Sequence, residues 1–264
     1  MAAFKQSRTV GRVTEITHVV PFKKGEPDGV PGLRYSDRCR IILEAFGKLE
    51  KEGFVSPVRR FAGIHFARWT LVDGDTRLLF TTNFDGTWED YIGDFTRRIP
   101  WSLGLIWCNC VDYPEDTPGA DDEDPWAAGA EDYPLFSKFV KKFQIDAGLF
   151  YAHYGELTVR DIRHLQIFYD EATRMLREGP GDLGELNRRV MQAQASVERA
   201  YETLPDRPFP GDGCLAPMPA DRKAIYKARI ETPIRELFPQ YNEKTLDAIM
   251  SEFGLGSRTE PKRW

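Results

Sequence analysis

The feature that most constrains this chain is a pair of strand-like runs joined by a four-residue turn. The runs IHFARWTLV (Ile64–Val72) and RLLFTTNF (Arg77–Phe84) are rich in β-branched and aromatic residues. The DGDT between them contains an Asp-Gly pair, which strongly favours a hairpin turn. The segment therefore predicts two antiparallel strands that follow one another directly.

Strand and helix patterns alternate around this hairpin. Before it come a β-branched run (Val13–Phe22) and a stretch with apolar residues every three or four positions (Tyr35–Leu49). After it, the pattern predicts a second helix (Thr87–Pro100) and a fourth strand with the sequence LGLIWCNCV (Leu103–Val111). The order βαββαβ predicts an α+β, ferredoxin-like fold, a four-stranded antiparallel sheet with both helices on one face.

The rest of the chain is of a different character. We expect residues 1–112 to form the ferredoxin-like domain, and residues 113–134 to form an acidic linker or loop, because Asp112–Pro134 holds nine acidic residues and no basic one. Residues 135–264 are expected to be mainly helical and to pack on the first domain. A long helix beginning near Thr158 is predicted to turn an apolar stripe inward: Val159, Ile162, Leu165, Tyr169, Ala172 and Leu176.

Composition limits the classes of partner. A formal net charge of -5 gives no general attraction to nucleic acid or anionic lipid, so we expect neither a nucleic acid nor a membrane as partner. No run approaches 18 apolar residues and the start of the chain lacks a secretory pattern, so we expect a cytoplasmic protein. The four cysteines form no CxxC pair and are expected to be buried and reduced.

Four polar residues of the hairpin are candidates for chemistry: His65, Arg68, Asn83 and Asp85. With an even-numbered turn, His65 lies opposite Phe84. With an odd-numbered turn it lies opposite Asp85, and a histidine–carboxylate pair forms that orients an imidazole for metal binding or proton transfer. The alternative is structural, with Asn83 and Asp85 making the turn into the next helix and capping its N-terminus.

Arg68 needs an anion, solvent or an acidic partner, because an unpaired guanidinium is costly to bury. It is suited to bind a carboxylate or a haem propionate, or else to reach solvent or pair at a dimer interface. Patterns typical of zincins, α/β-hydrolases and P-loop NTPases are missing from the sequence.

The segment GIHFARWTLVDGDTRLLFTTNFDGTWEDYIGDF (Gly63–Phe95) resembles bacterial peroxidase-related proteins of the dimeric α+β barrel type. The likeness extends to THVVPFKKGE (Thr17–Glu26) and FYAHYGELTVRDI (Phe150–Ile162), so it covers most of residues 13–165. It implies the ferredoxin-like sheet and a place near the dye-decolourising peroxidases and chlorite dismutases, which bind haem. NFDG (Asn83–Gly86) is similar to the GxxDG motif of these peroxidases only in its last two residues, so neither an axial ligand nor a distal acid carries over from it.

Three functions are consistent with these residues. The first is a peroxidase-like or other haem-dependent oxidoreductase acting on a small organic substrate, with His65 or His153 as haem ligand and Arg68 or Asp85 as acid–base or anion-binding group.

The second function is a cofactor-free enzyme with an apolar cavity lined by Trp69 and Trp107, in which His65 accepts a proton. The third is a non-catalytic dimeric interaction module. A homodimer is expected in each case, because the second face of the sheet is left uncovered.

Overall fold

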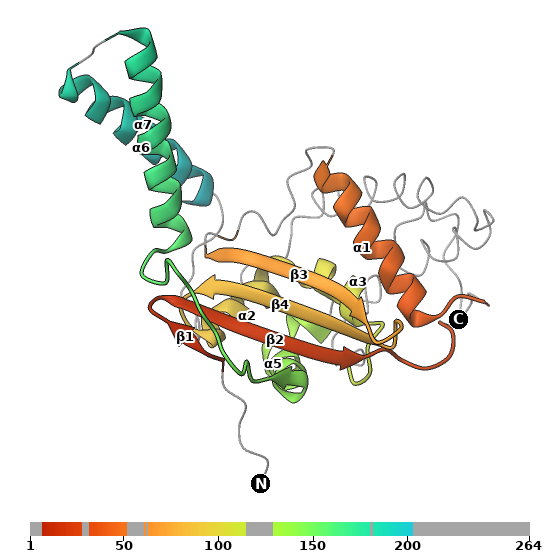
Figure 1. The fold of residues 1–264 in the computed structure, drawn as a ribbon. Helices are drawn as coiled ribbons and strands as arrows, with labels where there is room; N and C mark the ends of the chain where they lie inside the picture. Colours follow the sequence, from red (N-terminus) through yellow and green to blue (C-terminus); the bar gives the residue numbers. More distant parts are fainter. Residues whose placement is uncertain are drawn as a thin grey trace.

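The structure is a computed structural model that describes residues 7–27, 32–51, 61, 63–114, 129–179 and 182–202. Within these residues the chain is α+β, with a five-stranded antiparallel sheet and several helices (Figure 1). The strands are β1 (Thr9–Val10), β2 (Val13–Pro21), β3 (Ile64–Val72), β4 (Arg77–Asp85) and β5 (Gln144–Ile145). The helices are α1 (Tyr35–Lys51), α2 (Trp88–Arg98), α3 (Pro100–Trp107), α5 (Tyr133–Phe143), α6 (Val159–Glu178) and α7 (Leu183–Glu202).

The centre of the sheet consists of the three long strands in the order β2-β4-β3. β4 is antiparallel to both of its neighbours, and α1 lies between β2 and β3 in the chain. Three short segments share the other edge of β2: β1 pairs with Val13 and Thr14, β5 pairs with Thr17 and His18, and Cys110 forms a bridge with Phe22. The edge of β2 is therefore covered without one long fourth strand.

The predicted fourth strand (Leu103–Val111) is wrong, because most of it belongs to α3. Pro100 occupies the first turn of this helix, where its missing N–H is not needed. The residues Leu103, Leu105, Ile106 and Trp107 are all at most 3 % exposed, so the helix is apolar all round. A short run buried on every side has no periodicity that separates strand from helix.

Several other predicted elements are confirmed. The first strand, the helix from Tyr35, the hairpin, and the helices beginning after Thr87 and Thr158 all form. The Thr87 hydroxyl accepts a hydrogen bond from the Asp90 amide at 3.2 Å, and Thr158 and Asp161 form the reciprocal capping box. Cys39, Cys108 and Cys110 are buried and form no disulfide with one another, as predicted, whereas Cys214 and the tail from residue 205 lie outside the described residues.

Among the described residues, one face of the sheet packs against helices and the other does not. A single apolar core joins the sheet to α1, α2, α3 and α5, and Figure 1 shows α2, α3 and α5 behind the sheet. On β3 the residues alternate between half-buried and exposed, and Phe66 is 74 % exposed on the far side from this core. The open face expected from the sequence is therefore present in the part of the chain that the structure describes.

Helices α6 and α7 form a hairpin that extends away from the sheet (Figure 1). The prediction that α6 buries its apolar stripe is wrong for most of that stripe: Ile162, Leu165, Tyr169 and Leu176 are 41 %, 56 %, 65 % and 77 % exposed. Val159 alone is buried, because it lies at the point where α6 meets the sheet. The remainder of the helix runs beyond the sheet, and its partner is α7.

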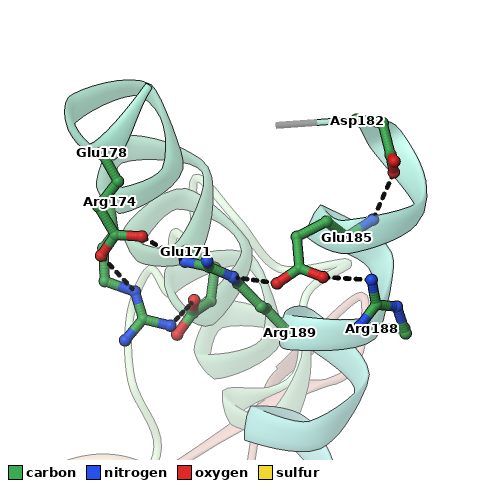
Figure 2. A network of polar contacts seen from close by, with 7 residues as sticks. All are labelled: Glu171, Arg174, Glu178, Asp182, Glu185, Arg188 and Arg189. Atoms are coloured by element: carbon green, nitrogen blue, oxygen red, sulfur yellow. Dashed lines mark hydrogen bonds and ion pairs between the residues drawn. The ribbon is translucent and has the colours of Figure 1, made fainter. Parts of the chain in front are cut away.

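A network of ion pairs joins the two helices at the far end of the hairpin (Figure 2). Arg189 of α7 donates to Glu178 of α6 and to Glu185 of its own helix, both at 2.7 Å. Arg174 pairs with Glu171 and Glu178, and Arg188 pairs with Glu185. Hydrogen bonds from Arg189 lower the pKa of both Glu178 and Glu185.

This network predicts acid sensitivity at the end of the hairpin. A carboxyl group whose folded pKa is lowered contributes stability above its unfolded pKa and loses that contribution as the pH falls through the folded value. We expect the amide resonances of residues 182–189 to shift as the pH is lowered from the ordinary glutamate value of 4.5. The effect is small, because exposed ion pairs are weak and screened by salt.

The matched variants are Glu185→Gln, which removes one carboxylate of the network, and Glu156→Gln, which removes an exposed carboxylate outside it. Glu185→Gln should reduce the acid-induced shifts, and Glu156→Gln should leave them unchanged. Identical titrations of wild type and Glu185→Gln would contradict the assignment.

Candidate functional site

A β-bulge in β3 determines the position of His65. Ala67 lies opposite Thr82 and Phe66 opposite Asn83, but Ile64 already lies opposite Phe84, so His65 is an extra residue in its strand. The turn is the even-numbered one, in which a regular ladder would place His65 opposite Phe84. The bulge redirects its side chain instead, and His65 Nε2 lies 2.8 Å from Asp85 Oδ1. The histidine–carboxylate pair thus forms because of the bulge, which was part of neither of the two expected registers.

Asp85 connects this pair to α6. Its Oδ2 atom accepts a hydrogen bond from the amide of Val159 at 2.9 Å, and its own amide donates to the carbonyl of Gly63 at 2.7 Å. Val159 is the first residue of α6, where the helix dipole favours a negative charge. The expectation that Asp85 caps the helix following the hairpin is wrong, because Thr87 caps that helix.

Two glycines allow other segments to approach the pair closely. The amide of Arg12 donates to the carbonyl of Gly155 at 2.7 Å, and the carbonyl of Arg12 accepts from Gly86 at 3.2 Å. Gly11 has a φ of +62°, and a Cβ atom there would lie 2.4 Å from the Gly155 oxygen. The turn between β1 and β2 therefore packs directly on the chain entering α6 and helps to fix the position of Asp85.

The pair is arranged for proton transfer at the second ring nitrogen. A carboxylate only accepts hydrogen bonds, so His65 Nε2 carries the hydrogen and Nδ1 of the neutral ring carries a lone pair. Nδ1 has no hydrogen-bond partner in the part of the chain that the structure describes. The side chains of His65 and Asp85 are 11 % and 17 % exposed, so the pair keeps some contact with solvent.

The other hairpin candidates lie on the open face. Arg68 lies opposite Thr81, is exposed, and forms no ion pair with any described residue. Asn83 lies between Phe66 of β3 and Glu15 of β2. By strand alternation, Asn83 and Asp85 point to the same side of β4, away from the core.

The remaining candidates lie elsewhere. Trp69 packs on Phe80 and Trp107 on the helix-covered face, with ring centroids 4.8 Å and 6.1 Å apart, so these tryptophans do not share a face with Arg68. His153 is exposed in the segment before α6, where its Nδ1 lies 2.8 Å from the hydroxyl of Tyr151. The structure thus brings together His65 and Asp85, and separates both from the tryptophans.

Two participants in the site were missed from the sequence. Val159 acts through its backbone amide, which no side-chain pattern reveals. A Cβ atom at Gly63 would lie 3.4 Å from the Cβ of Asp85, so the glycine leaves room for the carboxylate beside the strand. A glycine at the start of a strand run is a weak indication of such a close approach.

The described residues do not form a haem site around His65. Nε2 is bound to Asp85, which leaves Nδ1, and this atom adjoins the ring carbon that bears the rest of the side chain. A flat macrocycle approaching Nδ1 would collide with that carbon chain. Among the described residues there is also no group of three or more His, Cys, Asp or Glu that could hold a metal ion, and no helix long and apolar enough to cross a membrane.

Comparison with known proteins returned no matching family model, no matching curated protein and no matching solved structure. The resemblance to peroxidase-related proteins therefore stays a prediction.

Proposed function

We propose that this protein is an enzyme that removes a proton from a small organic molecule, with His65 as the proton acceptor and Asp85 as the carboxylate that orients it. The observation that supports this role is the 2.8 Å contact between His65 Nε2 and Asp85 Oδ1, which directs the lone pair of Nδ1 away from the carboxylate. A histidine held in this way can accept a proton, and the carboxylate stabilises the imidazolium that results.

The neighbouring residues favour a substrate with an apolar part and an anionic group. Phe66, next to His65 in the chain, is 74 % exposed and offers an apolar contact. Arg68 offers a guanidinium suited to a carboxylate. Arg68 lies three positions along β3 from His65, which corresponds to about 10 Å. A small carboxylic acid with a carbonyl group elsewhere on its skeleton spans such a distance.

The reaction balances without an oxidant or a second substrate. A C–H bond next to the substrate carbonyl breaks, and its electron pair stays on the substrate as an enolate. The proton forms a bond with Nδ1 of His65, and Asp85 carries the compensating negative charge. Returning the proton to the same or to another carbon atom completes an exchange or an isomerisation.

We infer that the sheet is a variant of the ferredoxin-like arrangement in which β1, β5 and Cys110 together take the place of the fourth strand. The order β2-β4-β3 and the helix between β2 and β3 support this. The expected homodimer is part of the same proposal: a second copy would cover the open face, with the substrate held at Phe66 and Arg68 between the two copies.

The test is a proton-exchange screen with the full chain in D₂O. Small keto acids are incubated with the protein, and the loss of the proton signals next to the carbonyl is followed by NMR, with heat-denatured protein as control. We expect faster loss with native protein for at least one acid. In parallel, long-range proton–nitrogen NMR at neutral pH should show His65 with its hydrogen on Nε2.

Exchange no faster than with denatured protein for every keto acid, or a hydrogen on Nδ1, would overturn the proposal. The visible spectrum after addition of hemin separates it from the haem-dependent oxidoreductase, since no Soret band assigned to His65 ligation should appear.

A further inference from the structure

His18 is the most unusual polar residue of the core. It lies in the middle of β2 with no exposed surface, and neither ring nitrogen has a hydrogen-bond partner within the described residues. Burial lowers the pKa of this imidazole to about 3, so the ring is neutral at ordinary pH. A neutral imidazole has one donor and one acceptor nitrogen, and both are left unmatched.

Two tryptophans of the same aromatic cluster also have an unmatched ring nitrogen, and one of them, Trp107, contacts His18. The indole nitrogens of Trp107 and Trp69 are buried and have no partner among the described residues. The ring centroid of Trp107 lies 6.1 Å from that of His18 and 6.1 Å from that of Trp69. Four unmatched nitrogens thus belong to three successive rings of one aromatic cluster, from β2, α3 and β3.

Several other polar groups of this core have partners, whereas the buried hydroxyl of Ser102 has none among the described residues. The indole nitrogen of Trp88 donates to Gln144 at 2.8 Å, and the hydroxyls of Thr82 and Tyr91 lie 2.6 Å apart. The side chain of Asn109 donates to the carbonyl of Leu105 at 3.0 Å. Buried polar groups without partners destabilise a fold and are rare in natural proteins. Their concentration around His18 therefore points to a ligand and not to a loosely satisfied core.

We infer that His18, Trp69 and Trp107 bind a small uncharged molecule through an oxygen atom that accepts hydrogen bonds. Indole nitrogens only donate, so the guest has to supply acceptor lone pairs. We infer an uncharged guest because the side chains in ring contact with His18, those of Trp107, Phe139 and Phe143, carry no charge. A charged guest would lose its hydration there without gaining a partner of opposite charge. An internal water and a small carbonyl compound both have this chemistry.

This site is separate from the His65–Asp85 pair. His18 lies opposite Phe80 on β4, whereas Asp85 lies opposite Val13, five residues further along β2. Five residues of strand correspond to about 17 Å. His18 also faces the helices, while Asp85 points to the open side of the sheet, so the inference does not depend on the proposed function.

The experiment uses the full wild-type chain and treats the two sources separately. Water-selective NMR should show cross-peaks between a long-lived water and the indole protons of Trp69 and Trp107. If the guest is organic, mass spectrometry under native conditions should instead show an added mass that is lost on denaturation. The indole proton of Trp88, bound to Gln144, is the internal control and should show neither contact.

The variant His18→Leu removes both nitrogens at similar side-chain volume. It should abolish the water cross-peaks or the added mass and lower the melting temperature. Wild-type protein with neither signal would overturn the inference, since edge-to-face contacts of the N–H groups with neighbouring rings would then satisfy them. A higher melting temperature for His18→Leu would overturn it as well, and the wild-type spectra decide alone if the variant does not fold.

Discussion

Replacing His65 with glutamine is expected to lower the rate of protein-catalysed proton exchange by about 100- to 10,000-fold, the usual contribution of a general base. Glutamine keeps a side chain that can hydrogen-bond to Asp85 but has no basic nitrogen at neutral pH. The fold should persist, because His65 is an extra residue in a bulge and does not belong to the buried core. The measurement is the first-order loss of the substrate proton signal in D₂O, compared with wild type at equal protein concentration.

His153→Gln is the matched control, because it removes a histidine that is exposed and bound to Tyr151. We expect it to exchange substrate protons at the wild-type rate. Asp85→Asn should lie between the two, since the amide can still contact the ring but no longer carries the charge that stabilises an imidazolium. An equal loss of rate in His65→Gln and His153→Gln would place the proton acceptor elsewhere.

The elements that the sequence predicted correctly are those with a local physical cause. Thr87 and Thr158 begin helices because a hydroxyl and a nearby carboxylate satisfy free amides of the first turn, and both residues are visible in the sequence. The hairpin forms around Asp73 to Thr76, where three consecutive residues, Asp73, Gly74 and Asp75, have positive φ angles. Aspartate and glycine tolerate this region better than most residues.

The failures have a common cause, which is that burial depends on the whole fold. Leu103 to Trp107 formed a helix because the surrounding core accepts an apolar segment of either kind. The stripe of α6 is a normal amphipathic pattern, but α6 leaves the sheet after Val159, so Leu165 and Leu176 stay exposed. Amphipathic spacing predicts which residues share a face and not whether anything covers that face.

The same distinction applies to the candidate site. A pairing of His65 with Asp85 could be foreseen as one of two registers, because a short hairpin turn allows only a few registers between its strands. The bulge that brings His65 and Asp85 together could not be foreseen, because no side-chain pattern in the sequence marks the position of the extra residue. Trp69 was grouped with His65, but the alternation of β3 places its ring on the helix-covered face with Trp107.

Replacing Asp85 with alanine is expected to lower the free energy of unfolding by about 2–3 kcal/mol, because two hydrogen-bond donors lose their acceptor at once. His65 Nε2 and the Val159 amide each donate to a different oxygen of this carboxylate, at 2.8 Å and 2.9 Å. Water replaces part of the loss, since the Asp85 side chain is 17 % exposed. Urea unfolding gives the total, and hydrogen exchange at Val159 should become faster in the variant.

The control for this variant is Asp90→Ala, because Asp90 is also an aspartate beside a helix N-terminus but bonds only within its own cap, to Thr87. The Asp90→Ala substitution should lower the free energy of unfolding by at most about 1 kcal/mol, the value of an exposed capping interaction. Asp85 differs because it holds β3, β4 and α6 together through one side chain. Equal losses in the two variants, with exchange at Val159 unchanged in Asp85→Ala, would show that α6 is attached to the sheet by other contacts.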